Sequence, residues 1–182
     1  MFRTKLIKDQ YQDFVMIEID KKDVFKMIRP YPLVFVMTID GEGKPTGMAC
    51  GWHMKCSLNP PLYAVALKKG KYTHEMIKNS KEFVVAFPSH ELEKEIEYFG
   101  TRSGKEFDKF KKTDIKTRES TYLRVPLVEK ASINMECFLQ DTFETSDHTV
   151  FVGKVVSAHY KPGQKLLFYL GQKEGVREFK EL

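Results

Sequence analysis

Short strand-like runs that follow one another with few helices between them limit most strongly what this chain can fold into. Apolar or β-forming runs recur at residues 33–39, 46–52, 62–67, 83–87, 133–140 and 149–160. A parallel sheet needs a helix after nearly every strand, and the sequence offers only a few short helical segments. The pattern therefore predicts a mainly β fold, either an antiparallel barrel or a sandwich.

Turn and proline positions indicate how the first runs are connected. The turn at residues 40–43 contains two glycines and joins the first two runs, which predicts a β-hairpin. Pro60 and Pro61 cannot donate hydrogen bonds to a sheet. The second run must therefore end before them, and we expect the next strand to begin at about Leu62.

The second half of the chain continues the strand pattern. Apolar and polar side chains alternate over residues 133–140, with Asn134 and Glu136 on the polar side. This period of two predicts a strand with one buried and one solvent-facing side. Residues 166–170 and 176–179 are expected to add final strands or a sheet edge.

Three helical segments are expected among the strands. Thr73 is a suitable N-cap for a helix over residues 74–79, and Ser89 for a helix over residues 90–99. A short charged helix is expected around residues 106–111, after a glycine-containing loop.

Residues 46–73 combine features that suit a flat, phosphorylated cofactor. Small residues over 46–52 surround a single indole, and glycine inside a strand often marks the close approach of a ligand. Lys71, Tyr72 and Thr73 stand at an expected helix start, where free amides and the helix dipole favour a phosphate. The alternative interpretation of this basic segment is a solvated turn.

Composition narrows the class of protein. At 182 residues the chain is predicted to be a single domain, with a hydrophobic fraction of 42% that suits a soluble protein. It shows neither a membrane-spanning apolar stretch nor the apolar core of a signal peptide, and its three cysteines are too few for a disulfide framework. We therefore expect a cytoplasmic protein without membrane contact. A net charge of +5 suits an anionic small ligand at least as well as nucleic acid.

Other chemistries have weaker support in the sequence. Cys50, His53 and Cys56 have zinc-ligand chemistry, but a strand would place His53 on the opposite face and no fourth ligand is evident, so no metal is predicted. Ser57 and His148 lack the Gly-x-Ser-x-Gly setting of a hydrolase nucleophile. Neither a dinucleotide-binding glycine fingerprint nor a phosphate-binding Walker loop is present.

In the order of many short motifs, the sequence resembles the flavin reductase-like family of FMN-binding split barrels, and within it the flavoredoxin branch. The resemblance spans about residues 29–160, the core of a single flavin reductase-like domain over 1–182, with 161–182 as a C-terminal extension. The residues that carry it are Pro32 with the apolar strand after it, Gly41-Glu42-Gly43, Gly51-Trp52, Ser57-Leu58-Asn59-Pro60-Pro61, Lys71-Tyr72-Thr73, Phe83-Val84-Val85-Ala86-Phe87-Pro88, Tyr98-Phe99-Gly100, Ser103-Gly104, Asp108-Lys109-Phe110, Glu136-Cys137 and Asp147-His148 with Gly153.

The resemblance implies a six-stranded antiparallel Greek-key split β-barrel that binds FMN, as a homodimer with flavin sites near the subunit interface. The residues that it places at the flavin ring are Thr46, Met48, Ala49, Cys50, Gly51 and Trp52, with Phe87 as a further cofactor-binding residue. Those that it places at the phosphate are Ser57, Lys71, Tyr72 and Thr73. Gly100, Ser103, Gly104 and Lys109 would close over the site, and His148, the candidate catalytic residue, would approach the ring. Many members have a glycine where this chain has Ser146.

Two functional hypotheses follow from this resemblance. In the first, the protein is an oxidoreductase that passes electrons from NAD(P)H or another reduced donor through bound FMN to free flavin, a partner protein or a small acceptor. In the second, it is an FMN-binding electron carrier with little nicotinamide turnover. A third hypothesis, a nucleic-acid-binding barrel, rests on the net charge and the 13% aromatic content, and we do not expect nucleic acid as a partner.

Overall fold

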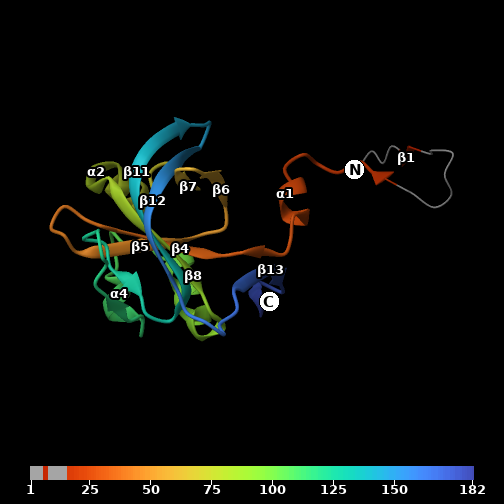
Figure 1. Ribbon diagram of the computed structural model, residues 1–182. Helices are drawn as coiled ribbons and strands as arrows, with labels where there is room; N and C mark the ends of the chain where they lie inside the picture. Colours follow the sequence, from red (N-terminus) through yellow and green to blue (C-terminus); the bar gives the residue numbers. More distant parts are fainter. Residues whose placement is uncertain (1–5, 8–15) are drawn as a thin grey trace.

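The structure is a computed structural model that describes residues 6–7 and 16–182 (Figure 1). The strands are β1 (Leu6–Ile7), β2 (Met16–Ile17), β3 (Tyr31–Pro32), β4 (Val34–Ile39), β5 (Pro45–Cys50), β6 (His53–Leu58), β7 (Pro61–Lys68), β8 (Glu82–Pro88), β9 (Thr117–Arg118), β10 (Leu127–Val128), β11 (Ala131–Glu144), β12 (His148–Tyr160), β13 (Leu167–Lys173) and β14 (Val176–Glu181). The helices are α1 (Val24–Met27), α2 (Tyr72–Ser80), the 3₁₀ helix η1 (His90–Leu92), α3 (Glu93–Thr101) and α4 (Lys109–Lys112).

The main sheet is antiparallel and closes on itself. Its strand order is β5-β4-β8-β11-β12-β7-β6, and the predicted hairpin is present as β4 and β5. β5 and β6 stand at opposite ends of that order, yet only Gly51 and Trp52 separate them in the chain. The amide of Ala66 in β7 donates to the carbonyl of Trp52 over 2.8 Å, so this corner is tied to the far end of the sheet. The mainly β barrel that we predicted is confirmed, as Figure 1 shows.

The sheet has seven strands where six were expected. The additional strand is β6, which pairs with β7 from His53 to Leu58. From the sequence, the preceding strand was expected to end at Trp52, and the residues before Pro60 were expected to form a break. Leu58 instead pairs directly with Pro61, so the prolines form the turn of a hairpin, and the chain before them can remain a strand.

Two hydrophobic cores lie on opposite faces of β4. Val34 and Val36 belong to an inner core with residues of β7, β8, β11 and β12, and Ile77 of α2 joins it from one end of the barrel. Phe35 and Met37 belong to an outer core with Ile96 and Phe99 of α3. Because alternate residues of a strand face opposite sides, an unbroken apolar run can serve both cores. Both helices also contact β5.

Helix boundaries differ from those that the capping residues predicted. Ser89 occupies the N-cap position of η1, the 3₁₀ turn that leads into α3, but its hydroxyl donates to the carbonyl of Lys130 over 3.1 Å and makes no capping hydrogen bond. The helix expected over residues 106–111 begins later, where the Asp108 carboxylate accepts the amide of Lys111 at 3.2 Å. An aspartate is an effective N-cap, and this one was overlooked.

β11 is buried on both faces from Ala131 to Cys137, so the prediction of a half-buried strand was wrong for this part, whereas Phe138 and the residues from Gln140 onward are exposed or partly exposed. Glu136 is fully buried, and its carboxylate accepts the amides of Thr121 and Tyr122 at 3.0 and 2.7 Å. His159 contacts the same carboxylate at 2.8 Å. The irregular segment that holds the short strands β9 and β10 therefore covers the polar face of β11 and supplies its hydrogen bonds.

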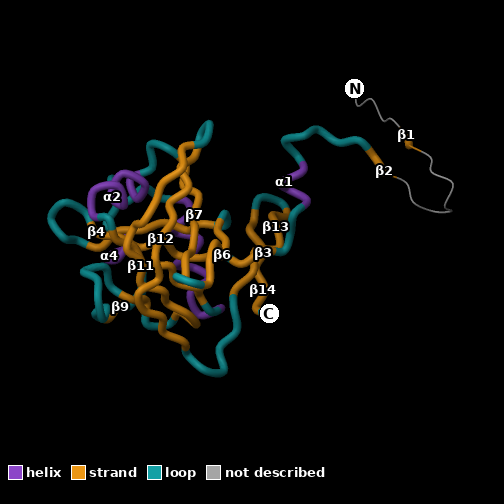
Figure 2. Tube along the Cα trace, turned by 45° about the horizontal axis from the view of Figure 1, so that its top comes forward, coloured by secondary structure: helices purple, strands orange, loops and turns teal. Residues whose placement is uncertain are grey.

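A small separate sheet, in the order β14-β13-β3, joins the C-terminal hairpin to the segment that enters the barrel. Figure 2 shows these strands gathered at one side of the barrel, next to the N-terminal arm that carries α1. The arm exposes apolar side chains such as Met27 and Ile28. Within residues 6–7 and 16–182, no helix has the length and apolar character needed to cross a membrane.

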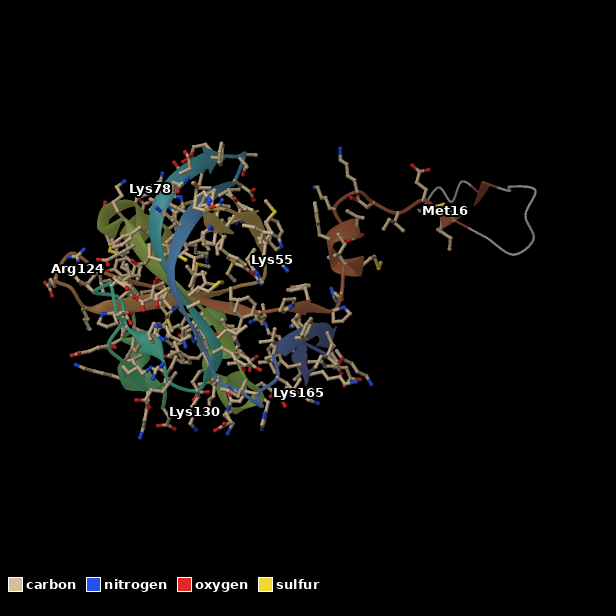
Figure 3. All side chains as sticks on the ribbon, viewed as in Figure 1. Met16, Lys55, Lys78, Arg124, Lys130 and Lys165 are labelled. Atoms are coloured by element: carbon tan, nitrogen blue, oxygen red, sulfur yellow. The ribbon has the colours of Figure 1, made fainter. Side chains whose placement is uncertain are left out.

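Basic side chains are spread over the molecule. In Figure 3, Lys55, Lys78, Arg124, Lys130 and Lys165 lie on different sides of the barrel. Several are paired with acids, for example Lys130 with Glu91 at 3.1 Å. The labelled basic side chains therefore do not form a single basic patch.

Candidate functional site

A cavity of about 320 Å³ lies between the N-terminal end of α2, the middle of β5 and the C-terminal end of α3. The predicted cofactor-binding residues that line it are Met48, Lys71, Tyr72, Thr73, Gly100, Ser103, Gly104 and Lys109. Thr101 and Arg102, inside the predicted loop from Gly100 to Gly104, also line it, and the lining residues that were not predicted are Gly70, Phe99, Glu106 and Phe107. Each of these is within two positions of a predicted one, so the local motifs had located the right segments but not every side chain.

The start of α2 supplies hydrogen-bond donors and positive charge to this cavity. Lys71, not Thr73, is the N-cap residue, with an extended backbone at φ −78° and ψ 141°. The amides of Tyr72 and Thr73 in the first turn have no acceptor within the helix. These amides, the helix dipole and the Lys71 ammonium together favour an anion such as a phosphate.

Thr73 is buried, and its hydroxyl makes no hydrogen bond to any residue that the structure describes. Because Thr73 lies inside the first turn, the hydroxyl is not needed as a cap. It is therefore available as a further donor to a group in the cavity.

The loop after α3 lies directly on β5. A second cavity of about 260 Å³ adjoins the first and shares Tyr72, Gly104 and Lys109 with it, and Thr46 lines this second cavity. A Cβ placed on Gly104 would stand 2.5 Å from Oγ1 of Thr46. A side chain at this position would force Thr46, Tyr72 or the loop to shift, so the glycine allows the cavity wall to close against the strand.

Lys109 joins the two walls of the cavity. Its Nζ donates to the carbonyls of Gly47 in β5 and Phe99 in α3, both at 2.9 Å, and the side chain is buried. Burial, with a smaller effect from the charge of Lys71, lowers the pKa of Lys109 to about 8. The ammonium is committed to two carbonyls, so this lysine fixes the position of β5 against α3 and is not a mobile cation that closes over a ligand.

Trp52 and His148 form a stacked pair outside this cavity. Their rings are 4.6 Å apart and tilted by 28°, and the indole is 51% exposed. Nδ1 of His148 lies 2.8 Å from a carboxylate oxygen of Asp147. The hydrogen bond to His148 lowers the pKa of Asp147, although partial desolvation opposes it. The role of His148 in catalysis stays a prediction.

Four other predicted site residues do not line the cavity. Cys50 is buried in the inner core, where burial raises the pKa of its thiol to about 12. Phe87 also packs in the inner core, against His53 and Tyr63. The two remaining residues are Gly51, which contacts Tyr31, and Ser57, which lies on β6.

The segment considered for zinc has other contacts. Nδ1 of His53 lies 2.6 Å from the hydroxyl of Tyr63, and Nε2 lies 3.0 Å from the carbonyl of Pro32. Cys50 is buried and Cys56 is exposed. Across the described ranges, no group of three histidine, cysteine or acidic side chains is placed to hold a metal ion.

A third cavity, of about 190 Å³, touches the first at Gly100 and contains Ala49, another of the predicted ring-facing residues. Its other walls come from Tyr31 and from Tyr169 and Arg177 of the C-terminal hairpin. Strands were predicted in this hairpin from the sequence, but no part in a site was expected for it. No local motif marks it, because its position depends on the pairing of β13 with the distant β3.

Comparisons with known proteins agree with this architecture. A protein of uncharacterised function from Archaeoglobus fulgidus is 38% identical over 126 residues, which cover 69% of this chain and 71% of the relative. An NADH-dependent FAD reductase of Streptomyces globisporus is 26% identical over 157 residues, with coverages of 84% and 85%. The crystal structure of a flavoredoxin from Methanosarcina acetivorans superimposes with a TM-score of 0.78 at 24% identity, with coverages of 92% and 91%. The family description "Flavin reductase like domain" matches residues 27–177, and the chain therefore belongs to the flavin reductase like domain family.

Proposed function

We propose that this protein is an FMN-binding oxidoreductase that accepts electrons from a nicotinamide donor, NADH or NADPH. The observation that carries the proposal is the cavity in which the start of α2 faces the wall formed by β5. One end of this cavity offers amides, a hydroxyl and a lysine, which suit a single phosphate group. The neighbouring wall of small residues and Met48 suits a flat ring.

The residues present fit FMN by their chemistry. Lys71 and the amides of Tyr72 and Thr73 would hold the phosphate, and the Thr73 hydroxyl would add one hydrogen bond. Met48 would contact the ring, and Gly104 leaves room for the loop to lie close to it. Bound flavin supplies the hydride-accepting and electron-transferring chemistry. The chain's own part is to bind the cofactor, orient it and limit access of water.

The nicotinamide donor is supported by the relative from Streptomyces globisporus, which is named as an NADH-dependent FAD reductase. Electrons would leave to free flavin, a partner protein or another small acceptor. The second hypothesis from the sequence, a carrier with little nicotinamide turnover, uses the same cavity. The experiment that separates the two is anaerobic stopped-flow mixing with NADH and NADPH, in which an oxidoreductase loses the absorbance of oxidised flavin rapidly and a carrier does not.

FMN binding itself has a direct test. The purified protein is expected to be yellow, or to quench the fluorescence of added FMN, and to release FMN in preference to FAD on denaturation. A colourless protein that fails to quench FMN fluorescence would refute the proposed function.

The phosphate position is tested with Thr73→Val. Loss of a hydrogen bond to a charged group should weaken FMN binding by about ten- to a hundredfold. Riboflavin has the same ring without the phosphate, so its affinity should change little. Equal weakening of both ligands would place the phosphate away from Thr73.

A further inference from the structure

The third cavity is formed where the C-terminal hairpin meets the barrel. Figure 2 shows β13 and β14 beside β3, at the side of the barrel from which the N-terminal arm leaves. Along β14, Arg177 and Phe179 are partly buried whereas Lys180 is exposed. Phe179 and Tyr169 pack against the outer core, so the hairpin is held in place by apolar contacts. Arg177 is then presented to the cavity by the alternation of the strand.

Arg177 brings a positive charge to this cavity and has no ion-pair partner among the described residues. No carboxylate of the described residues lies within 4.0 Å of its guanidinium, although eleven other side-chain pairs in the same part of the chain meet that limit. Arg177 also approaches the flavin cavity closely, since a Cβ on Gly100 would stand 3.0 Å from its Nη1. A guanidinium that faces a cavity and is not committed to a carboxylate is available to bind an anionic ligand.

Two tyrosines form further walls of this cavity, together with Leu33. The rings of Tyr31 and Tyr169 lie 5.4 Å apart, and the guanidinium of Arg29 stands 5.7 Å from the ring of Tyr169. Burial, with a smaller effect from Tyr169, raises the pKa of Tyr31, so its hydroxyl remains a proton donor at neutral pH. Two phenols and a guanidinium can together bind phosphate oxygens.

We propose that this cavity binds the diphosphate part of the nicotinamide donor, with Arg177 as the residue that recognises its charge. The inference rests on the proposed function, because the donor's ring must reach a flavin in the adjoining cavity. Gly100 borders both cavities, so one dinucleotide could place its ring in the first and its phosphates in the third. The C-terminal hairpin, which no motif singled out, would then determine the affinity for the donor.

The test compares Arg177→Gln with Arg177→Lys and with the matched control Lys180→Gln, which removes the same charge from the solvent side of the same strand. FMN-loaded proteins are titrated with NAD⁺ by calorimetry, since the oxidised dinucleotide binds without reacting. Loss of a charge-assisted hydrogen bond should weaken NAD⁺ binding by about ten- to a hundredfold in Arg177→Gln. Arg177→Lys should recover part of this loss, and Lys180→Gln should match the wild type.

A second measurement separates charge recognition from damage to the flavin site. The variants are reduced anaerobically with NADH and with 1-benzyl-1,4-dihydronicotinamide, which carries the same reacting ring without phosphates. Arg177→Gln should raise the KM for NADH by a similar factor and leave reduction by the benzyl compound unchanged. Unchanged NAD⁺ affinity in Arg177→Gln, or equal slowing with both reductants, would overturn the inference. Every variant and the wild type are also titrated with FMN. If the wild type binds no FMN, the proposed function is wrong; if FMN binding is normal and only the NAD⁺ result fails, the inference about Arg177 is wrong.

Discussion

Replacing Lys109 by methionine tests how the cavity walls are held together. Methionine keeps most of the side-chain length but removes the ammonium, and it leaves the carbonyls of Gly47 and Phe99 without their partner. Two hydrogen bonds from a charged group contribute about 3 to 6 kcal/mol together. Burying the charge costs about 3 kcal/mol, from the lowering of the pKa of Lys109 from 10.5 to about 8. We therefore expect Lys109→Met to reduce the free energy of unfolding by at most about 3 kcal/mol at pH 7.

The pH dependence of this difference has a definite sign. Between pH 8 and 10.5 the unfolded chain keeps the proton on Lys109 while the folded protein has lost it, so the wild type gains stability as the pH rises. The neutral amine still donates to both carbonyls. The gap between wild type and Lys109→Met should therefore widen by up to about 3 kcal/mol from pH 8 to 10.5.

Urea unfolding of the flavin-free proteins at pH 7, 8, 9 and 10 measures this gap. Lys112→Met is the matched control, since Lys112 lies on the same helix α4 and is exposed, and it should follow the wild type at every pH. A gap that stays constant or narrows as the pH rises would refute the reasoning, because the burial of Lys109 would then not disfavour its charge.

Three further predictions concern other parts of the molecule. Burial raises the pKa of Glu136, but hydrogen bonds from His159, Thr121 and Tyr122 outweigh it and lower the pKa. Glu136→Gln should therefore reduce the free energy of unfolding in urea by about 2 to 4 kcal/mol at neutral pH, and by less in acid. Gly104→Ala should weaken FMN binding about tenfold or more in fluorescence titrations, whereas Gly41→Ala, which has open space around it, should not. Light scattering is expected to return twice the 21.2 kDa monomer mass, because apolar residues such as Met54 and Leu58 are exposed along β6 and a second copy would cover them. A monomer mass at micromolar concentration would contradict this prediction.

Local signals predicted those parts of the site that depend on neighbouring residues. The turn at residues 40–43 fixed the hairpin of β4 and β5, and the basic segment at Lys71 marked the start of α2. Both depend on backbone preferences within a few residues. The error in the cap of α2 was small, because Lys71 and Thr73 lie in the same turn.

Features that depend on distant segments could not be predicted from the sequence. From the sequence alone Glu136 is expected to face solvent, whereas in the structure the segment around Thr121 covers it. From the sequence alone Lys109 is expected to be a free cation, whereas in the structure it donates to carbonyls of β5 and α3. Arg177 belongs to no motif, and only the pairing of β13 with β3 brings it to the barrel. In each case the partner is far away in the sequence, and periodicity carries no information about it.

The edge strand β14 of the small sheet has a consequence for self-association. The main sheet closes into a barrel and so protects its outer strands, but β14 ends the sheet β14-β13-β3 with unpaired backbone groups. Such an edge strand can pair with a strand of another molecule and so begin aggregation. β14 carries Arg177, Glu178, Lys180 and Glu181, and charges on an edge strand discourage that pairing. The same strand thus presents a charge to the cavity on one face and keeps further chains from adding to it along its free side.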